Sequence, residues 1–454
     1  MTKAKSTRYE QMPVLNAHAA GIDVGSREHY VAIGQGREHV KKFGVYTENL
    51  MELCTYLQAN GVTSVALEST GSYWKNLFML LQQHGLNPIL VNGSFTKNLK
   101  GRKTDVLDCQ FIQRMHCLGL LPDSFQPDDF TDQVRTLVRH RTNLLSEIAD
   151  NTKRIQQCLR NMNVRLDVAV SDTMGKSGQT IIEAIIAGER NALALAKLCD
   201  VNIKKSEAEV AAALNGFFRS DFLIQLKQLM HTFHFFRTQL SDLDKELDAM
   251  IQRYLVATNK SERPFTQAKK DKKRLQKNDP KFDLDQKAFQ LYNGVNMLEV
   301  PGISYSTSLV FMSEVGQNIS KFGSSKSLTS WLRLSPNKKI TGGKVIGNGL
   351  RHGANALALS LRSAANTIGN MKKDIPLTRF FKRLAFKYGR TAAITGTARK
   401  LAVILWNMLT KIEAYQPPSM EAYEHRIRSS SIKNMQRKIN ALKIKPEDLC
   451  FVSA

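Results

Sequence analysis

Residues 18–33 read HAAGIDVGSREHYVAI, and this stretch decides the fold of the N-terminal region. A short apolar segment ends at Asp23, a Gly-Ser pair follows, and a second segment runs through Tyr30 to Ile33, which together predict a β-hairpin. Residues 38–45 predict a third strand beside it. The first strand therefore places a carboxylate at its own carboxyl end.

Helix and strand signals alternate over the next sixty residues. Thr47 is a good N-cap for a helix that Gly61 ends, and residues 62–68 form a buried-type strand that delivers Glu68. A second helix is expected over 73–84, and the strand after it lies near 88–91. This order implies a mixed sheet with helices packed on it, in which ligands gather at the carboxyl ends of strands.

The next helix opens with KTDVLDCQFI at residues 103–112, which contains Asp105 and Asp108. Residues three apart on a helix share a face, with Cβ atoms roughly 5–6 Å apart, so the two carboxylates could hold one cation. Acidic residues are also common in a first helical turn because the helix dipole favours them. The pair alone does not separate these two interpretations.

The two strand ends provide the further acids that the helix pair needs. If Asp23 and Glu68 lie beside Asp105 and Asp108, four carboxylates repel each other unless cations neutralise them. Carboxylate oxygens are ligands that Mg²⁺ prefers, and two such ions can stabilise the attacking and leaving oxygens of phosphoryl transfer. The sequence therefore predicts a magnesium site, with two ions.

The acid motifs as a set resemble a known family. Gly-Ile-Asp-Val-Gly around Asp23, Leu-Glu-Ser-Thr-Gly around Glu68 and Lys-Thr-Asp-Val-Leu-Asp ending at Asp108 are similar to the RuvC-like, RNase H-fold domain of DEDD insertion-sequence transposases. That family also contains the Piv-type invertases and the bridge-RNA-guided recombinases. The resemblance spans most of the chain and implies that Asp23, Glu68, Asp105 and Asp108 are metal-binding catalytic residues.

Composition points to a polyanionic partner. The 454 residues carry a formal charge of +25, and no apolar run approaches the ~18–20 residues that cross a bilayer, so nucleic acid is expected as partner and membrane is not. The six cysteines form no Cys-x-x-Cys pair, which argues against a zinc site or a disulfide framework and fits a reducing cytoplasm. We expect a protein of the bacterial cytoplasm or nucleoid.

Two long segments in the middle of the chain, 134–162 and 222–250, carry apolar residues at three-four spacing. This pattern predicts long amphipathic helices that bury an apolar stripe against a partner helix. The two could pair with each other or with another subunit, and the family resemblance implies a coiled-coil dimer arm. A compact helical insertion is expected over 178–190, and the lysine-rich residues 258–283 are either a solvated linker or a segment that follows phosphates.

Leu-Glu-Val-Pro-Gly-Ile-Ser at residues 298–304 has the form of a helix-hairpin-helix element, in which Gly302 would offer backbone N–H groups to a phosphate. A plain tight turn is the alternative. Further on, Thr341, Gly342, Gly343 and Lys344 form a loop suited to anions, because glycines let the backbone approach phosphate closely and the lysine adds charge.

The loop at 341 resembles the part of the family's C-terminal transposase domain that carries a nucleophilic serine just before the glycines. This chain has threonine at that position, whose hydroxyl is the same kind of nucleophile but whose methyl group restricts χ1. Ser335 is a nearby alternative that precedes a proline and does not align with the motif. We favour Thr341.

These observations predict an α/β plus α protein: a RuvC-like mixed-sheet domain, a long coiled-coil middle and a mainly helical C-terminal domain with a helix-hairpin-helix element. The expected boundaries are 1–125, 126–290, 291–415 and a basic tail at 416–454, which would order only on nucleic acid.

The predicted function is that of a Mg²⁺-dependent DNA transposase or recombinase with a covalent protein–DNA intermediate. Family resemblance further implies donor and target DNA, a structured guide RNA, and a homo-oligomer that is a dimer or, on DNA, a tetramer. The site would combine the N-terminal and C-terminal domains. Two alternatives are a metal-dependent Holliday-junction-type nuclease in which water attacks, and a non-catalytic nucleic-acid-binding assembly protein.

Overall fold

The computed structural model of the protein describes residues 12–93, 104–200, 203, 205–262, 275–336, 339–347, 349 and 355–443. The chain divides into two compact units, Met1–Gln126 and Pro127–Ala454.

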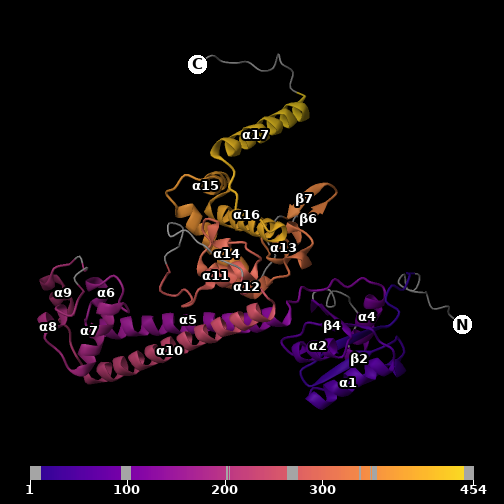
Figure 1. The fold of residues 1–454 in the computed structure, drawn as a ribbon, viewed down its shortest axis with the longest axis horizontal. Coiled ribbons are helices and arrows are strands. Elements are labelled where there is room, and N and C mark those ends of the chain that lie inside the picture. Colours follow the sequence, from indigo (N-terminus) through magenta and orange to yellow (C-terminus); the bar gives the residue numbers. More distant parts are fainter. Residues whose placement is uncertain are drawn as a thin grey trace. The chain divides into compact units, whose positions relative to one another are not determined.

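The first unit is built on a mixed sheet, as the sequence predicts (Figure 1). Among its described residues the strands are β1 (Ala19–Val24), β2 (Glu28–Ala32), β3 (Val40–Gly44), β4 (Ser64–Glu68) and β5 (Asn87–Val91). Their order in the sheet is β3-β2-β1-β4-β5. The hairpin strands β1, β2 and β3 pair antiparallel, whereas β4 lies parallel to β1 and to β5. The predicted fold class is confirmed.

Helices cover the sheet on two faces. Leucines of α1 (Thr47–Ala59) and α2 (Trp74–Gln83) pack on one face, where alternate residues of β1 and β4, among them Ile22 and Leu67, form the main core. The helix α4 (Asp105–Cys117) packs against β1 on the other face, beside Ala66. The N-cap prediction for α1 is wrong by one residue. Tyr46 is still extended and is the cap residue, so Thr47 is already helical.

Gly21 allows α4 to lie directly on β1. A Cβ atom at this position would collide with the backbone of Gln113 and lie 2.5 Å from the carbonyl oxygen of Cys109. Buried amides fix the contact, because Gln113 Nε2 donates to the Ala19 carbonyl at 3.1 Å and Gln110 Nε2 donates to the Gln35 carbonyl at 2.8 Å. The start of α4 is therefore held at the carboxyl end of β1.

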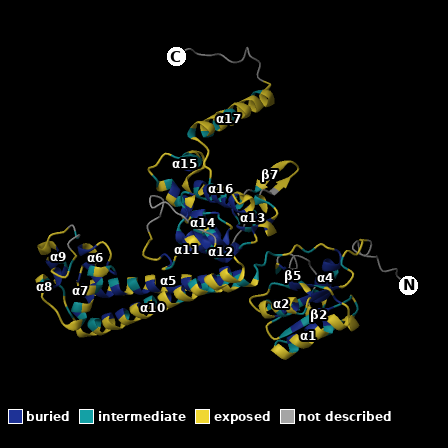
Figure 2. Ribbon diagram, viewed as in Figure 1, coloured by how far each residue is buried: buried dark blue, intermediate teal, exposed yellow. Residues whose placement is uncertain are grey.

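The second unit begins with a long helical hairpin. Helices α5 (Asp129–Asn161) and α10 (Ser220–Ala257) pair antiparallel along their length, so the two periodic segments partner each other within one chain (Figure 1). A small group of helices closes the far end of the hairpin and shares its core (Figure 2). These helices are α6 (Leu166–Ala169), α7 (Lys176–Ala187), α8 (Ala192–Ala196) and α9 (Glu207–Leu214). The lysine run at 269–274 lies outside the described residues.

A buried ion pair joins the two arms of the hairpin. Arg141 Nε donates to Asp244 Oδ1 at 2.7 Å, and both side chains are almost fully buried. A second guanidinium nitrogen reaches Asp244 Oδ2 and the Asn278 carbonyl oxygen, while the backbone N–H of Lys281 donates to the same carboxylate. The segment around 278–281 is thereby fastened to the arm.

The remaining described residues form a mainly helical domain around α12 (Tyr305–Val315), α14 (Ala356–Asn370) and α16 (Arg390–Lys411). Around them are α11 (Leu284–Leu291), α13 (Ser325–Trp331), α15 (Pro376–Tyr388), α17 (Met420–Leu442) and a two-stranded hairpin of β6 (Lys339–Thr341) and β7 (Lys344–Gly347). None of the described helices combines the length and the apolar character needed to cross a membrane.

The expectation of an unordered tail is wrong for residues 420–442, which form α17. Ser419 caps this helix, since its hydroxyl accepts a hydrogen bond from the Ala422 N–H at 3.1 Å. Glu424 then pairs with Arg379 of α15, which ties the first turns of the basic helix to the domain.

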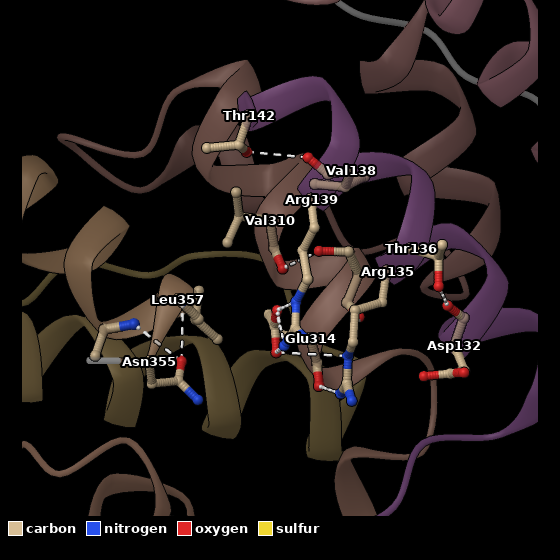
Figure 3. A network of polar contacts seen from close by, with 12 residues as sticks. Asp132, Arg135, Thr136, Val138, Arg139, Thr142, Val310, Glu314, Asn355 and Leu357 are labelled. Carbon is tan, nitrogen blue, oxygen red and sulfur yellow. Dashed lines mark hydrogen bonds and ion pairs between the residues drawn. The ribbon is translucent and has the colours of Figure 1, made fainter. Parts of the chain in front are cut away.

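Two arginines of α5 anchor the arm to this domain by converging on Glu314 of α12 (Figure 3). Arg139 donates to the Glu314 carboxylate at 3.0 Å, and Arg135 donates to the carbonyl oxygens of Ser313 and Glu314. Glu314 is only 3% exposed. Because Arg135 also donates to the last carbonyl oxygens of α12, the contact neutralises the Glu314 charge and satisfies the end of the helix.

We expect Arg141→Ala to lower the free energy of unfolding by about 3–5 kcal/mol, because it leaves the buried Asp244 carboxylate uncompensated. The control is Arg165→Ala, which removes an exposed pair with Asp167 and should lower the free energy of unfolding far less. Urea unfolding followed by circular dichroism at 222 nm measures both. The double variant Arg141→Met, Asp244→Leu should recover most of the lost stability. Equal losses of stability in Arg141→Ala and in the control Arg165→Ala would contradict the assignment.

Candidate active-site carboxylates and hairpin

The sheet register places Asp23 and Glu68 side by side. Ile22 of β1 is paired with Leu67 of β4, so the next residues along these parallel strands, Asp23 and Glu68, are neighbours at the carboxyl edge. Ile22 and Leu67 point into the core beneath α1 and α2. Because side chains alternate along a strand, both acids lie on the opposite face, which is the face that α4 covers.

The first turn of α4 adds the other two acids at this edge. Thr104 is the N-cap residue, and its hydroxyl accepts from the Leu107 N–H at 3.4 Å, so the helix begins at Asp105. Asp105 is exposed and Asp108 is half-buried. Both acids stand at the positive end of the helix dipole, where carboxylates are favoured.

The electrostatics show that the four acids share one neighbourhood. Burial, followed by the negative charges of Glu68, Asp105 and Asp108, raises the pKa of Asp23 from 3.8 to about 6. A hydrogen bond from the Val24 backbone opposes this shift without cancelling it. The structure therefore brings together all four carboxylates that the sequence singles out, at a net cost to the charged form of Asp23.

Cys109 of α4 also lies close enough to Asp23 to feel its charge. Burial raises the pKa of its thiol to about 12, with a further contribution from the charge of Asp23. Its Sγ lies 3.1 Å from the Val106 carbonyl oxygen within the helix. The thiol therefore stays protonated and adds no negative charge beside the acids.

The chemistry of the four side chains fits a hard divalent cation, since all the donors are carboxylate oxygens. Within the part of the chain that the structure describes, no three histidine, cysteine, aspartate or glutamate side chains are close enough to hold one ion together. An ion at this edge would therefore have to draw the acids inward. Burial and the charges of the other acids both raise the pKa of Asp23, and a bound cation would offset the repulsive part of that cost.

The sheet register also adds two residues that our sequence analysis did not single out. Tyr30 of β2 is paired with Asp23, and Lys42 of β3 is paired with Tyr30, so a phenol and an ammonium group continue the row of the acids across the sheet. Lys42 Nζ is 2.9 Å from Glu28 Oε1. The hairpin at 18–33 could have indicated Tyr30, because a short turn fixes which residues stand opposite each other.

Thr341 lies on a hairpin, where the sequence predicts a glycine loop. It is the last residue of β6, is paired with Lys344, and is exposed. Gly342 and Gly343 form the turn with φ of +55° and +75°, which is the left-handed backbone that a type I′ hairpin requires. The two glycines are therefore needed to build a tight reversal, and they place the threonine hydroxyl at the exposed end of a strand.

Ser335 is a poorer nucleophile candidate than Thr341 in this structure. Its hydroxyl donates to Oγ1 of Thr329 at 3.1 Å, and Thr329 is fully buried. The side chain is thus turned toward the protein interior.

Gly302 has a packing role that the sequence did not indicate. Its φ is +86°, and a Cβ atom here would lie 2.8 Å from the Ala364 carbonyl oxygen of α14. Ser304 then caps α12, because its hydroxyl accepts a hydrogen bond from the Thr307 N–H. The turn requires glycine for close contact with α14, and its predicted phosphate contact stays a prediction.

Comparison with known proteins now defines the class of protein, which is that of transposases. Residues 20–164 match a family model described as a transposase of the IS110 DEDD type. Residues 295–377 match a second model, described as the transposase IS116/IS110/IS902 family. The first match contains the four carboxylates and the second contains Gly302 and the β6–β7 hairpin.

The chain belongs to the IS110 family of DEDD transposases. It is 28% identical over 120 residues to the transposase for insertion sequence element IS1111A of Coxiella burnetii. That match covers 26% of this chain and 33% of the relative, so the chain aligns with about a third of the relative's length.

The raised pKa of Asp23 makes stability depend on pH in a defined direction. Since the folded pKa exceeds the unfolded one, stability is lost as the pH rises from about 4 to about 6 and stays reduced above that. With solvent screening the loss is on the order of 1–2 kcal/mol.

We therefore expect Asp23→Asn to raise the melting temperature by about 2–6 °C over the natural chain at pH 7.5 without divalent cations. At pH 4 the two melting temperatures should coincide. Differential scanning fluorimetry at both pH values measures this, and an equal difference at both would show that Asp23 is not crowded by acids.

Proposed function

We propose that this protein is a Mg²⁺-dependent DNA transposase or recombinase that cleaves and exchanges strands of an insertion sequence. The observation that carries the proposal is the gathering of Asp23, Glu68, Asp105 and Asp108 at one sheet edge, where burial and the charges of the other three acids raise the pKa of Asp23. Family membership and a charge of +25 support DNA as the substrate.

The four carboxylates would hold Mg²⁺, with two ions as the preferred number. Bound there, the cations would stabilise the charge that builds up on the oxygens of the reacting phosphodiester. The protein's own contribution is the rigid frame: β1 and β4 fix Asp23 and Glu68, and the α4–β1 contact fixes Asp105 and Asp108.

Thr341 would supply the nucleophile. Its Oγ1 attacks the phosphorus of a DNA phosphodiester, the P–O bond to the leaving strand breaks, and that strand departs as a free hydroxyl while the other strand becomes a phosphothreonine ester. The proton leaves Oγ1 for a base as the leaving oxygen gains one. The exposed position of Thr341 at the end of β6 supports this role, because a phosphodiester can approach it.

The partners follow from the same proposal. Donor and target DNA are the substrates, and family resemblance adds a structured guide RNA and a homo-oligomer, dimeric or tetrameric on DNA. The phosphate-binding role would fall to Gly302, Gly342, Gly343 and Lys344. Purification from cells that carry the flanking DNA of the element, followed by sequencing of co-purified RNA, tests the guide: recovery of only random cellular RNA would count against it.

We expect Mg²⁺ to raise the melting temperature of the natural chain at pH 7.5, because it binds the folded carboxylates and not the unfolded chain. The stabilisation is about 2.7 kcal/mol when the ion is at a hundredfold its dissociation constant. Asp105→Asn should remove most of this shift. The matched control is Asp129→Asn, which also alters an acid in a first helical turn, at the start of α5, and should keep the shift. A Mg²⁺ response that survives Asp105→Asn would place the ion elsewhere.

We expect Thr341→Ala to abolish both strand cleavage and the covalent protein–DNA adduct on DNA that carries the element's ends. Thr341→Ser should retain both, since it keeps the hydroxyl. Ser335→Ala is the control, because that hydroxyl donates to Thr329, and it should leave the adduct unchanged. Denaturing gel electrophoresis of labelled DNA detects cleavage and adduct together. Full cleavage by Thr341→Ala would favour the junction-type nuclease in which water attacks.

A further inference from the structure

A cavity of about 550 Å³ lies in the second unit between α15, α16, the connection after α16 and the start of α17. This volume is within the usual range of ligand-binding sites. None of its lining residues belongs to the β6–β7 hairpin or to the four carboxylates, so neither the metal site nor the nucleophile accounts for it. Its lining has a composition that points to one class of ligand.

Four cations line the cavity. Arg383 comes from α15, Lys400 and Lys411 from α16, and Arg426 from α17. Glu413 is the one acid among the lining residues. Loss of hydration, followed by the charge of Arg426, lowers the pKa of Lys400. Lys400 and Arg426 therefore lie close enough for each cation to disfavour the other.

Aromatic rings form another part of the wall. Phe380, Tyr415 and Tyr423 line the cavity, and the Arg383 guanidinium lies 5.7 Å from the Phe380 ring centre. The Tyr423 hydroxyl oxygen is buried and has no hydrogen-bond partner among the described residues. A buried hydroxyl without a partner is costly.

The cavity is held open by contacts of its own. Arg379 pairs with both Asp374 and Glu424, which fixes the first turns of α17 against α15. The backbone N–H of Tyr415 donates to the Glu299 carboxylate at 3.3 Å, which fixes the connection that carries this ring. The lining residues therefore have a defined arrangement before any ligand arrives.

We propose that this cavity binds one nucleotide of a single-stranded nucleic acid, with the base against Tyr415 and Tyr423 and its phosphate among Lys400, Arg383 and Arg426. Flat rings and cations in one cavity match a base joined to a phosphate, and stacking on an aromatic ring tolerates any base. A base inside a duplex cannot enter, because its faces are covered by its neighbours. The inference deepens the proposed function by adding a strand-holding site to it, and it rests on nucleic acid as the partner.

The test uses the full chain and twelve-nucleotide DNA and RNA strands that carry 5-iodouracil, irradiated without Mg²⁺ so that no cleavage is needed. We expect cross-links to map by mass spectrometry to Tyr415 or Tyr423, and the same strands annealed to a complement to give few. Cross-links confined to other parts of the chain would overturn the proposal. Because strand cleavage plays no part, Thr341→Ala should cross-link like the natural chain, which separates this test from that of the nucleophile.

Matched variants of α17 separate a specific phosphate contact from general charge. Arg426→Ala should weaken binding of the single strand about tenfold in fluorescence anisotropy and reduce the salt dependence by about 0.7 in the log–log slope, the value for one phosphate contact. Arg437→Ala removes an exposed cation of the same helix that does not line the cavity, and its effect should be below twofold. Equal losses in the two variants would overturn the site.

Two further measurements define the ligand. The natural chain should bind a strand without bases about tenfold more weakly than the ordinary strand, because the Tyr415 ring then has no base to stack on. Tyr415→Leu, which lacks the ring, should bind the two strands equally well. Free 5-iodouridine monophosphate should cross-link much less than the strand at equal concentration. Efficient cross-linking of the free nucleotide would overturn the assignment to a strand. Melting temperatures confirm that each variant is folded.

Discussion

The candidate active site depends on the close contact between β1 and α4 at Gly21. Asp23 is placed by the strand, and Asp105 and Asp108 are placed by the helix, so their distance is set by how closely the two backbones approach. Any side chain at Gly21 would collide with the Gln113 backbone and push the helix away. The buried amides of Gln113 and Gln110 that hold the contact are neutral and add no charge of their own beside the acids.

The second unit relies on charge pairs in a different way. Arg141 and Asp244 are buried in the middle of the arm, where a single misaligned turn would leave both charges without a partner. Apolar stripes at three-four spacing can slide by a turn at small cost, whereas a buried ion pair cannot. We infer that the pair fixes the register of α5 on α10. Arg135 and Arg139 then transmit that register to the C-terminal domain through Glu314 (Figure 3).

Sequence patterns predicted the elements of the sheet domain and the two long helices, because alternation and heptad spacing are local signals. They left the partner of each long helix open, since a stripe does not identify what buries it. The contacts between α5 and α10, among them the buried Arg141–Asp244 pair, show the pairing. The four acids were predictable as a set of strand ends and a helix start. Tyr30 and Lys42 were not singled out, because their place beside Asp23 depends on cross-strand register. The high charge of the tail suggested that it orders only on nucleic acid, which is wrong over residues 420–442. Ser419 caps a helix there, and the Glu424–Arg379 pair supports it.

The position of Thr341 on a tight hairpin changes what its loop can do. A flexible glycine loop could wrap a phosphate in several backbone conformations, whereas in a type I′ turn the backbone of Gly342 and Gly343 has one fixed conformation. The proposed phosphate contact would then rest on N–H groups held in that turn and on Lys344, which is paired with Thr341 across the ladder. A β-branched threonine suits a strand better than a loop, because its restricted χ1 costs little there. The hairpin thus accounts for threonine at this position on conformational grounds and keeps its hydroxyl within reach of a phosphodiester.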